Sequence, residues 1–222
     1  MSGASEHSGP GGRGTDVVMD FLSDLTEHRL LAIVRGTDPR AALDTVLTLA
    51  AEGVRLIEVS LVTAGAPEVI RDARAALGPG AHLGAGTVVT AGDARRAADA
   101  GASFLVTPAV SEAVGAGVTL GLPVLAGALT PTEVVAARAA GAAAIKLFPA
   151  SLGGVRHLRA LRDPFPDIPF VPVGGVGPAE AAEYLAAGAV AVGVGSPLVG
   201  DAAAGGDLGE LTARVRRFLE TP

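Results

Sequence analysis

The 222-residue sequence contains no cysteine, no tryptophan and one tyrosine, and aromatic residues make up only 3% of it. The lack of cysteine excludes disulfides, thiolate metal sites and cysteine nucleophiles, and it is compatible with the reducing cytoplasm, where we expect the protein to reside. No apolar run is long enough to span a membrane. Hydrophobic residues nevertheless make up 49% of the chain, so the core must consist mainly of Ala, Val, Leu and Ile. Such a core is typical of helices packed on parallel strands.

The 17 basic residues are outnumbered by 23 acidic residues, so the formal net charge is −6. A negative chain is a poor partner for nucleic acid or for an anionic membrane, because both reward basic surfaces. The histidines do not have the spacing of metal ligands, which disfavours a metal-dependent enzyme; they are His7, His28, His82 and His157. Residues 1–15 are rich in Gly and Ser and lack the hydrophobic segment of a signal peptide. We predict a disordered tail there, followed by a single domain over residues 16–222.

Only one of the 17 basic residues is a lysine, and this residue, Lys146, lies inside the apolar run 142–148. Unlike arginine, lysine can lose its proton. Burial disfavours the ammonium form and lowers the pKa of the amine, which makes Lys146 a candidate nucleophile toward a carbonyl carbon. The alternative is a lysine at a strand end whose ammonium group reaches water.

A repeated unit extends from Asp16 onward, in which a helical stretch ends at glycine and a short apolar run follows. Glycine is a common helix terminator because it tolerates a left-handed backbone. Alternating helices and strands predict parallel strands joined by crossover helices. Eight strands are predicted, over residues 30–35, 56–60, 83–87, 103–106, 123–126, 144–147, 170–173 and 190–194. Eight such units predict an α/β fold, a (β/α)8 TIM barrel with an extra N-terminal helix over residues 16–29. A doubly wound open sheet is the alternative.

In such barrels the chemistry lies at the carboxyl ends of the strands. Glu58 lies in the apolar strand 56–60, and side chains alternate along a strand. If Glu58 points into the barrel, Leu56 and Ser60 do so too, whereas Ile57 and Val59 meet the helices. The same alternation turns Lys146 inward in the sixth strand. Because both strands are even-numbered, Glu58 and Lys146 could share one interior layer, either as an acid/base and a nucleophile or as a purely structural ion pair.

Glycines lie at the ends of the seventh and eighth strands, at Gly174, Gly175, Gly193 and Gly195, and the last is followed by Ser196. Glycine lets backbone N–H groups approach an anion closely, and these two loops form the usual phosphate site of the fold. Each glycine pair alone indicates no more than a tight turn. Together, beside a buried lysine, they predict a phosphorylated substrate.

The chain resembles the class I aldolases that act on 2-keto-3-deoxy-6-phosphogluconate (KDPG) and its galactonate epimer, the KDPG/KDPGal aldolase family. The resemblance extends from about Leu30 to about Leu198 and covers every predicted strand. It rests on seven successive motifs, Glu58-Val-Ser-Leu61, Gly84-Ala-Gly-Thr87, Val106-Thr-Pro108, Leu125-Ala-Gly127, Lys146-Leu-Phe-Pro-Ala150, Pro172-Val-Gly-Gly-Val176 and Gly193-Val-Gly-Ser196.

The resemblance implies a homotrimer that cleaves the phosphorylated keto acid to pyruvate and glyceraldehyde 3-phosphate, without a metal or an organic cofactor. It implies that Lys146 forms the Schiff base and that Glu58 is the general acid/base. The substrate-binding residues that it implies or that lie at strand ends are Arg35, Thr87, Thr107, Pro108 and Phe148. The expected phosphate ligands are Gly174, Gly175, Gly195 and Ser196.

One position departs from the family pattern. Members acting on the gluconate compound usually carry Arg four residues after the glutamate, where this chain has Val62, and the galactonate relatives usually carry Asn there. Those relatives also tend to have an arginine at the end of the first strand, as Arg35 is here. We hypothesise that Arg35 takes over the contacts of the missing arginine. The substrate could then be the gluconate, the galactonate or a shorter 4-hydroxy-2-oxo acid.

Two other classes of protein share the phosphate loops. A phosphosugar epimerase, or a barrel similar to thiamine-phosphate synthase, would use proton transfer or a metal without needing an amine nucleophile. A non-catalytic barrel would bind the phosphorylated keto acid without turning it over. Reductive trapping of pyruvate separates the first class from an aldolase, and turnover separates the second.

Overall fold

The computed structural model describes residues 11–220, with side chains from Thr15 onward. Eight parallel strands form one sheet in the order β7-β6-β5-β4-β3-β2-β1-β8, and a bridge between Val173 and Gly193 joins its two edges. The strands are β1 (Leu30–Val34), β2 (Leu56–Ser60), β3 (His82–Gly86), β4 (Leu105–Val106), β5 (Val124–Ala128), β6 (Ala144–Leu147), β7 (Phe170–Pro172) and β8 (Val192–Val194). The predicted barrel is confirmed, and the alternative of an open sheet is wrong.

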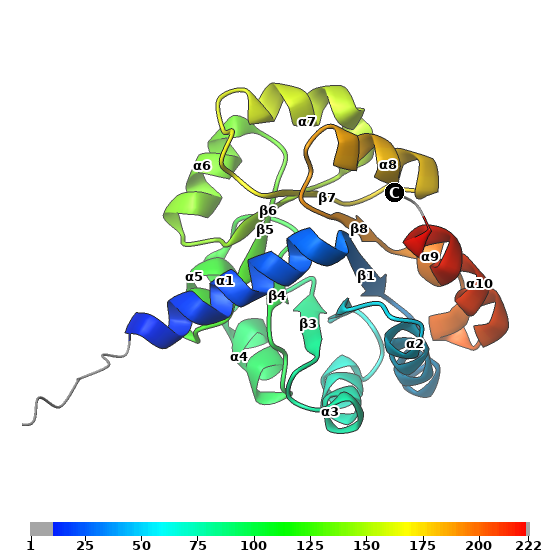
Figure 1. The fold of residues 1–222 in the computed structure, drawn as a ribbon. Coiled ribbons are helices and arrows are strands. Elements are labelled where there is room, and N and C mark those ends of the chain that lie inside the picture. The colour runs from blue at the N-terminus through cyan, green and yellow to red at the C-terminus, as the bar shows by residue number, and fades with distance from the viewer. Residues whose placement is uncertain (1–10, 221–222) are drawn as a thin grey trace, which may run out of the picture.

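Helices surround the barrel in sequence order (Figure 1). They are α2 (Pro39–Ala51), α3 (Ala66–Leu77), α4 (Ala91–Asp99), α5 (Glu112–Thr119), α6 (Pro131–Ala139), α7 (Gly154–Arg162), α8 (Pro178–Ala186) and α10 (Leu208–Leu219), with short turns η1 (Ala150–Leu152), α9 (Ser196–Val199) and η2 (Ala202–Ala204). The glycines predicted to end helices all have positive φ, between 75° and 97°, at Gly53, Gly101, Gly121, Gly141 and Gly188. These glycines therefore serve as the left-handed terminators that the sequence indicated.

The core has two layers separated by the strands. Leu56 and Ala144 belong to a cluster inside the barrel, whereas Ile57, Val59 and Ile145 pack in the larger cluster between the strands and the outer helices. This division confirms the predicted alternation in β2 and β6. It also fixes the direction of Glu58 and Lys146, which lie on the interior side of their strands.

A further helix, α1 (Gly11–His28), lies across the amino ends of the strands, in front of the barrel in Figure 1. Its residues Phe21 and Leu25 are fully buried in the interior cluster, and the Phe21 ring lies 4.9 Å from that of Phe104. Arg29 ends the helix with φ of 58°. The predicted N-terminal helix is therefore present, and it closes the amino end of the barrel.

The helix starts earlier than predicted. Residues 1–10 of the predicted tail lie outside the described residues, but residues 11–15 are helical. Extending an existing helix adds a hydrogen bond for each residue that it fixes, so a well-packed helix can propagate into a segment with poor helix propensity. Composition alone pointed to disorder for these five residues.

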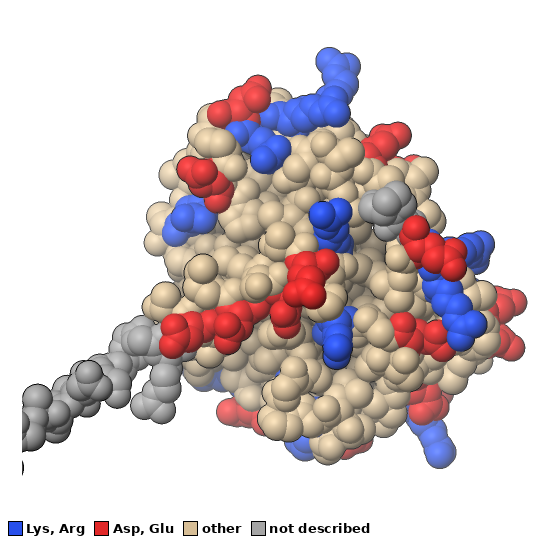
Figure 2. Space-filling model, in the orientation of Figure 1, with Lys and Arg blue, Asp and Glu red and all other residues tan. Residues whose placement is uncertain are grey.

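The outer face of α1 is acidic, and Figure 2 shows a row of carboxylates along it. Asp24 accepts a hydrogen bond from His82 Nε2 at 2.6 Å, which ties the helix to β3. No helix among the described residues is long and apolar enough to cross a membrane.

Several arginines donate hydrogen bonds to backbone carbonyl groups. Arg74 donates to the carbonyl groups of Gly78, Ala81 and Gly101, which joins the end of α3 to neighbouring turns. Arg162 donates to Ala187 O at 2.9 Å, and Arg214 to Leu198 O at 2.8 Å. The fork of donors on a guanidinium group suits several acceptors at once, which a lysine cannot match. These contacts explain part of the preference for arginine in this chain.

Candidate active site

A cavity of about 430 Å³ opens at the carboxyl ends of the strands. Nine of the eleven predicted site residues line it, namely Arg35, Thr87, Pro108, Lys146, Phe148, Gly174, Gly175, Gly195 and Ser196. Glu58 and Thr107 do not. Sequence reasoning missed several apolar residues of the lining, among them Ile33, Val173, Val176 and Val199. Apolar residues at strand ends carry no chemical signal that separates a cavity wall from the core.

Lys146 lies in β6, between Gly127 of β5 and Val171 of β7. Only 6% of the residue is exposed, and its Nζ atom lies 5.0 Å from the centre of the Phe148 ring. The side chain therefore lines the cavity as a buried group rather than reaching out to solvent. The alternative of a lysine that extends to water does not fit this placement.

Glu58 lies in β2, which pairs with β1 and β3, and is 1% exposed. Its carboxylate occupies the space that a side chain at Gly86 would need, since a Cβ there would lie 2.3 Å from Glu58 Oε1. Glu58 Oε2 has no hydrogen-bond partner among the described residues. Burial raises the pKa of Glu58, although the nearby charges of Lys146 and Arg35 act to lower it. This residue is therefore a buried carboxyl group with a free oxygen and a raised affinity for a proton.

Thr87 follows β3 and has φ of 57°. A β-branched residue in the left-handed region is a genuine outlier and costs roughly 1–3 kcal/mol, so the surrounding structure must hold it there. The Thr87 hydroxyl lies 2.8 Å from that of Ser60, a fully buried residue of β2. Such strain concentrates at functional sites. Ser60 was predicted to face inward but was not predicted as part of the site.

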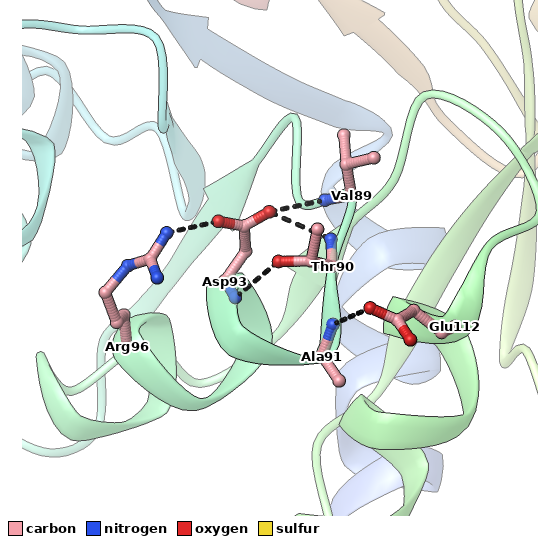
Figure 3. Close-up of polar contacts among 6 residues, drawn as sticks. All are labelled: Val89, Thr90, Ala91, Asp93, Arg96 and Glu112. Atoms are coloured by element: carbon pink, nitrogen blue, oxygen red, sulfur yellow. Dashed lines mark hydrogen bonds and ion pairs between the residues drawn. The ribbon is translucent and has the colours of Figure 1, made fainter.

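The loop after Thr87 is fixed where α4 begins (Figure 3). Thr90 Oγ1 accepts from the N–H of Asp93, and Asp93 Oδ2 accepts from the N–H groups of Thr90 at 2.8 Å and Val89 at 3.2 Å. Partial burial acts to raise the pKa of Asp93, but these hydrogen bonds and the contact with Arg96 outweigh it and lower the pKa. The capping box thus holds the chain that leads away from the cavity.

Glu112 of α5 adds a further contact to the same loop by accepting from the N–H of Ala91 at 3.0 Å. A second capping box, formed by Thr130 and Glu133, begins α6 in the same way. Hydrogen bonds from the N–H of Leu129 and from Thr130 lower the pKa of Glu133. The loops after β3 and β5, which lie on either side of β4, are therefore anchored by matching contacts.

Thr107 has a structural contact in place of a position in the cavity wall. Its hydroxyl donates to Ala109 O at 2.7 Å and accepts from the N–H of Gly127 at 3.3 Å. Gly127 has no room for a side chain, because a Cβ there would lie 2.2 Å from the Pro108 carbonyl oxygen. Thr107 therefore holds the turn after β4 against β5, and this turn brings Pro108 to the cavity.

The glycines after β7 are required by both conformation and space. Gly174 and Gly175 have φ of 95° and 75°, and a Cβ on Gly175 would lie 2.9 Å from Ser151 Cβ. On the neighbouring strand, Gly195 precedes α9, and Ser196 is its first residue. Backbone from two adjacent loops thus forms one wall of the cavity, with a hydroxyl group at its edge. Because glycine has no side chain, the backbone N–H groups of such a wall can approach an anion closely.

The departure from the family pattern has a clear location. Val62 is 62% exposed and does not line the cavity, whereas Arg35 does. An exposed position beyond β2 could reach the cavity only with a long side chain, which valine lacks. The charge of Arg35, like that of Lys146, acts to lower the pKa of the Glu58 carboxyl group.

Comparison with known proteins gives consistent results. The family model described as "KDPG and KHG aldolase" matches residues 22–213. A probable 2-dehydro-3-deoxy-6-phosphogalactonate aldolase of Rhizobium meliloti is 38% identical over 82% of this chain and 87% of its own length. A KHG/KDPG aldolase of Escherichia coli is 37% identical over 81% and 85%.

A solved structure from Legionella pneumophila aligns with a TM-score of 0.80 and 26% identity, over 90% of this chain and 97% of that one. It is a structure of a KDPG aldolase with pyruvate captured at low pH as a covalent carbinolamine intermediate. A carbinolamine is the adduct of an amine with a carbonyl carbon. In that relative, therefore, an amine attacks pyruvate.

Proposed function

Because this chain belongs to the KDPG and KHG aldolase family, we propose that it cleaves 2-keto-3-deoxy-6-phosphogluconate reversibly to pyruvate and glyceraldehyde 3-phosphate through a Schiff base. The observation that carries this proposal is the buried amine of Lys146 at the cavity, close enough to the buried carboxyl group of Glu58 for its charge to act on the pKa of that group. Glu58 Oε2 has no hydrogen-bond partner among residues 11–220. The family assignment favours an aldolase over the epimerase and over a barrel that only binds. The reaction fits a place in Entner–Doudoroff sugar breakdown.

Lys146 acts as the nucleophile in this proposal. Its neutral amine adds to the C2 carbonyl carbon to give a carbinolamine, which loses water to form an iminium. The C3–C4 bond then breaks, and its electron pair moves into the iminium to give an enamine. The C4 hydroxyl loses its proton and becomes the aldehyde of glyceraldehyde 3-phosphate.

Glu58 supplies the proton transfers. Its carboxylate takes the C4 hydroxyl proton, directly or through water, and later returns a proton to C3 of the enamine before water releases pyruvate. Because burial raises the pKa of this carboxyl group, it can hold a proton nearer to neutral pH than an exposed glutamate can. The free Oε2 atom leaves an acceptor available for that proton.

The remaining predicted residues bind the substrate. Gly174, Gly175, Gly195 and Ser196 would hold the phosphate, and Thr87, Pro108 and Phe148 would contact the pyruvyl group. A phosphate held far from the reacting bond supplies binding energy that places C4 over the base. We also propose that the protein is a homotrimer, as the resemblance implies, and its mass in solution measured by light scattering tests this.

The galactonate epimer is a second candidate substrate, favoured by Arg35 at the cavity and by the absence of an arginine at Val62. We expect Arg35→Ala to raise KM for the preferred keto acid about tenfold or more, since it removes a charged hydrogen-bond donor. Measuring kcat/KM for the gluconate, the galactonate and 4-hydroxy-2-oxoglutarate, in the wild type and in this variant, identifies the substrate. An unchanged KM for all three would show that Arg35 does not contact the substrate.

The first experiment is to incubate the protein with pyruvate and borohydride and then to measure the intact mass and map the peptides. We expect a single reduced pyruvyl adduct on Lys146. A folded protein that forms no adduct would contradict the Schiff-base mechanism. The epimerase or the non-catalytic barrel would then become the preferred function.

A further inference from the structure

Ser60 and Thr87 form a pair of hydroxyl groups behind the cavity wall. Ser60 is fully buried and does not line the cavity, whereas Thr87 does. Their oxygen atoms lie 2.8 Å apart, and either atom could be the donor by distance alone. This contact is the only hydrogen bond of the Ser60 side chain among the described residues. The direction of the bond therefore decides where the hydrogen of Thr87 points.

A hydroxyl group has one hydrogen to donate and can also accept. If Thr87 donated to Ser60, the hydrogen of Ser60 would be buried without an acceptor, and a buried donor without a partner is costly. If Ser60 donates to Thr87, both hydroxyl hydrogens can find an acceptor. Ser60 then uses its hydrogen, and the hydrogen of Thr87 is free to turn toward the cavity, where a ligand or water can accept it.

We infer that Ser60 is a positioning residue, which donates to Thr87 and thereby fixes Thr87 as a hydrogen-bond donor toward an acceptor oxygen of the bound keto acid. This inference rests on the proposed function, because it takes the cavity to be the keto-acid site. A pyruvyl group offers acceptor oxygens on its carboxylate and on C2. The carboxylate stays intact through the reaction, whereas the C2 oxygen leaves as water. The carboxylate is therefore the oxygen that a fixed donor can serve throughout.

The backbone at Thr87 does not depend on Ser60. Leu61 N donates to Gly86 O at 2.8 Å, and Val88 N donates to Val106 O at 3.1 Å, so the main chain is held on both sides of Thr87. Those bonds maintain the strained φ of 57°. Among residues 11–220, only Ser60 forms a hydrogen bond with the Thr87 hydroxyl and so restrains its rotation. Removing the Ser60 hydroxyl should therefore leave the loop in place and release only the direction of the Thr87 hydrogen.

The experiment is a double-mutant cycle on kcat/KM for keto-acid cleavage, with Ser60→Ala, Thr87→Val and the double variant. Valine keeps the β-branched shape at position 87 and removes only the hydroxyl. We expect about a fivefold loss for Ser60→Ala, mainly in KM, and a loss of about tenfold or more for Thr87→Val. The double variant should be no worse than Thr87→Val, because Ser60 acts only through that hydroxyl.

Two further variants serve as controls. Ser60→Thr retains a hydroxyl and should restore most of the activity lost in Ser60→Ala. Ser103→Ala removes a serine hydroxyl at the other end of the barrel, where Ser103 Oγ donates to Leu83 O at 3.2 Å, and should leave kcat/KM unchanged. Thermal unfolding of each variant, followed by circular dichroism, shows whether it is folded at the assay temperature.

The outcomes separate this inference from the proposed function. Wild-type kcat/KM in Ser60→Ala, or independent losses that multiply in the double variant, would overturn the role of Ser60 while leaving the aldolase intact. A wild-type protein without turnover and without a borohydride adduct would overturn the proposed function, and the inference would fall with it.

Discussion

At the amino end of the barrel, a cavity of about 580 Å³ lies beside α1, and its polar lining residues include Asp24, Arg55 and His82. At the carboxyl end the cavity is smaller, about 430 Å³, but its lining includes the buried Lys146. At the amino end, Asp24 and His82 are partly exposed and pair with each other. Glu58, near the other end, is 1% exposed and has an oxygen without a hydrogen-bond partner in the part of the chain that the structure describes.

The comparison shows that volume alone does not locate the chemistry. A charged group at a surface costs little, whether or not it is paired. A charged group inside a protein is expensive unless it is fully satisfied, so its retention calls for a functional reason. In the described part of the chain, Glu58 and Lys146 are the only buried side chains among the Asp, Glu, Lys and Arg residues, and both belong to the carboxyl end.

The largest effect is expected from Lys146→Arg, which keeps the charge and removes the nucleophile. Turnover should fall at least about a thousandfold, because a covalent mechanism has no substitute for the amine. The protein should remain folded, as judged by circular dichroism. Near-normal turnover in this variant would contradict the comparison, because Lys146 would then be a buried charge at the carboxyl end without a catalytic role.

Glu58→Gln should lower kcat by about 10²- to 10⁴-fold, which is the usual range for a general acid/base. Pre-steady-state formation of the pyruvate adduct should suffer less than the release of pyruvate, because amine addition depends mainly on Lys146. Stopped-flow and quench measurements separate the two steps. If kcat is unaffected, the buried carboxyl group is not the acid/base.

Phe21→Ala sharpens the comparison from the amino end. Phe21 is 1% exposed and packs on Phe104, so the cavity left behind should cost about 3–5 kcal/mol of stability. For a chain of this length, that corresponds to a decrease in Tm of roughly 10 °C. At a temperature where the variant is folded, kcat/KM should match the wild type. A selective loss of kcat/KM would show that the amino end influences the chemistry.

The buried carboxyl group near the carboxyl end should also make the stability of the protein depend on pH. The pKa of Glu58 is raised in the folded state above its ordinary value of 4.5, so the native protein binds more protons than the unfolded chain between the two pKa values. Stability from this group is therefore fully present below pH 4.5 and is lost as pH rises through the folded pKa. In urea unfolding, Glu58→Gln should be less stable than the wild type at low pH relative to neutral pH. A pH-independent difference would mean that the pKa is not raised.

The smallest effect is expected from Asp24→Asn, which removes the carboxylate charge but keeps a side-chain oxygen that can accept the hydrogen bond from His82. Its side chain is 40% exposed, so the loss should be at most about 1 kcal/mol. Urea unfolding measures this cost, and kcat/KM should stay unchanged. A loss of several kcal/mol would show that the amino-end pair is far less solvated than its exposure indicates.

The fold and most of the cavity lining could be predicted from the sequence because two periodic signals agree. Glycine marks the ends of the helices, and alternation along β2 and β6 sets which side chains face inward. Those rules placed Glu58 and Lys146 on the interior side. They predicted the limits of the strands less accurately, since β4 begins at Leu105 rather than at residue 103.

The contacts that sequence reasoning missed depend on backbone conformation. The contact between Ser60 and Thr87 accompanies a positive φ at a threonine, for which the residue type gives no signal. The placement of Thr107 depends on a hydrogen bond to Gly127 on the next strand. The apolar cavity wall is likewise indistinguishable from core by composition. Local patterns therefore predicted which residues lie at the carboxyl end, but not how their polar atoms pair.

Helix α1 comes first in the sequence, yet its binding site is built from later parts of the chain. Phe21 packs against Phe104, so the helix can dock only after β4 is in place. We expect its contacts to be largely absent from the folding transition state, in which case weakening them accelerates unfolding and hardly slows folding. The helix would then govern how long a folded molecule lasts, while the strands and their crossover helices govern how fast it forms.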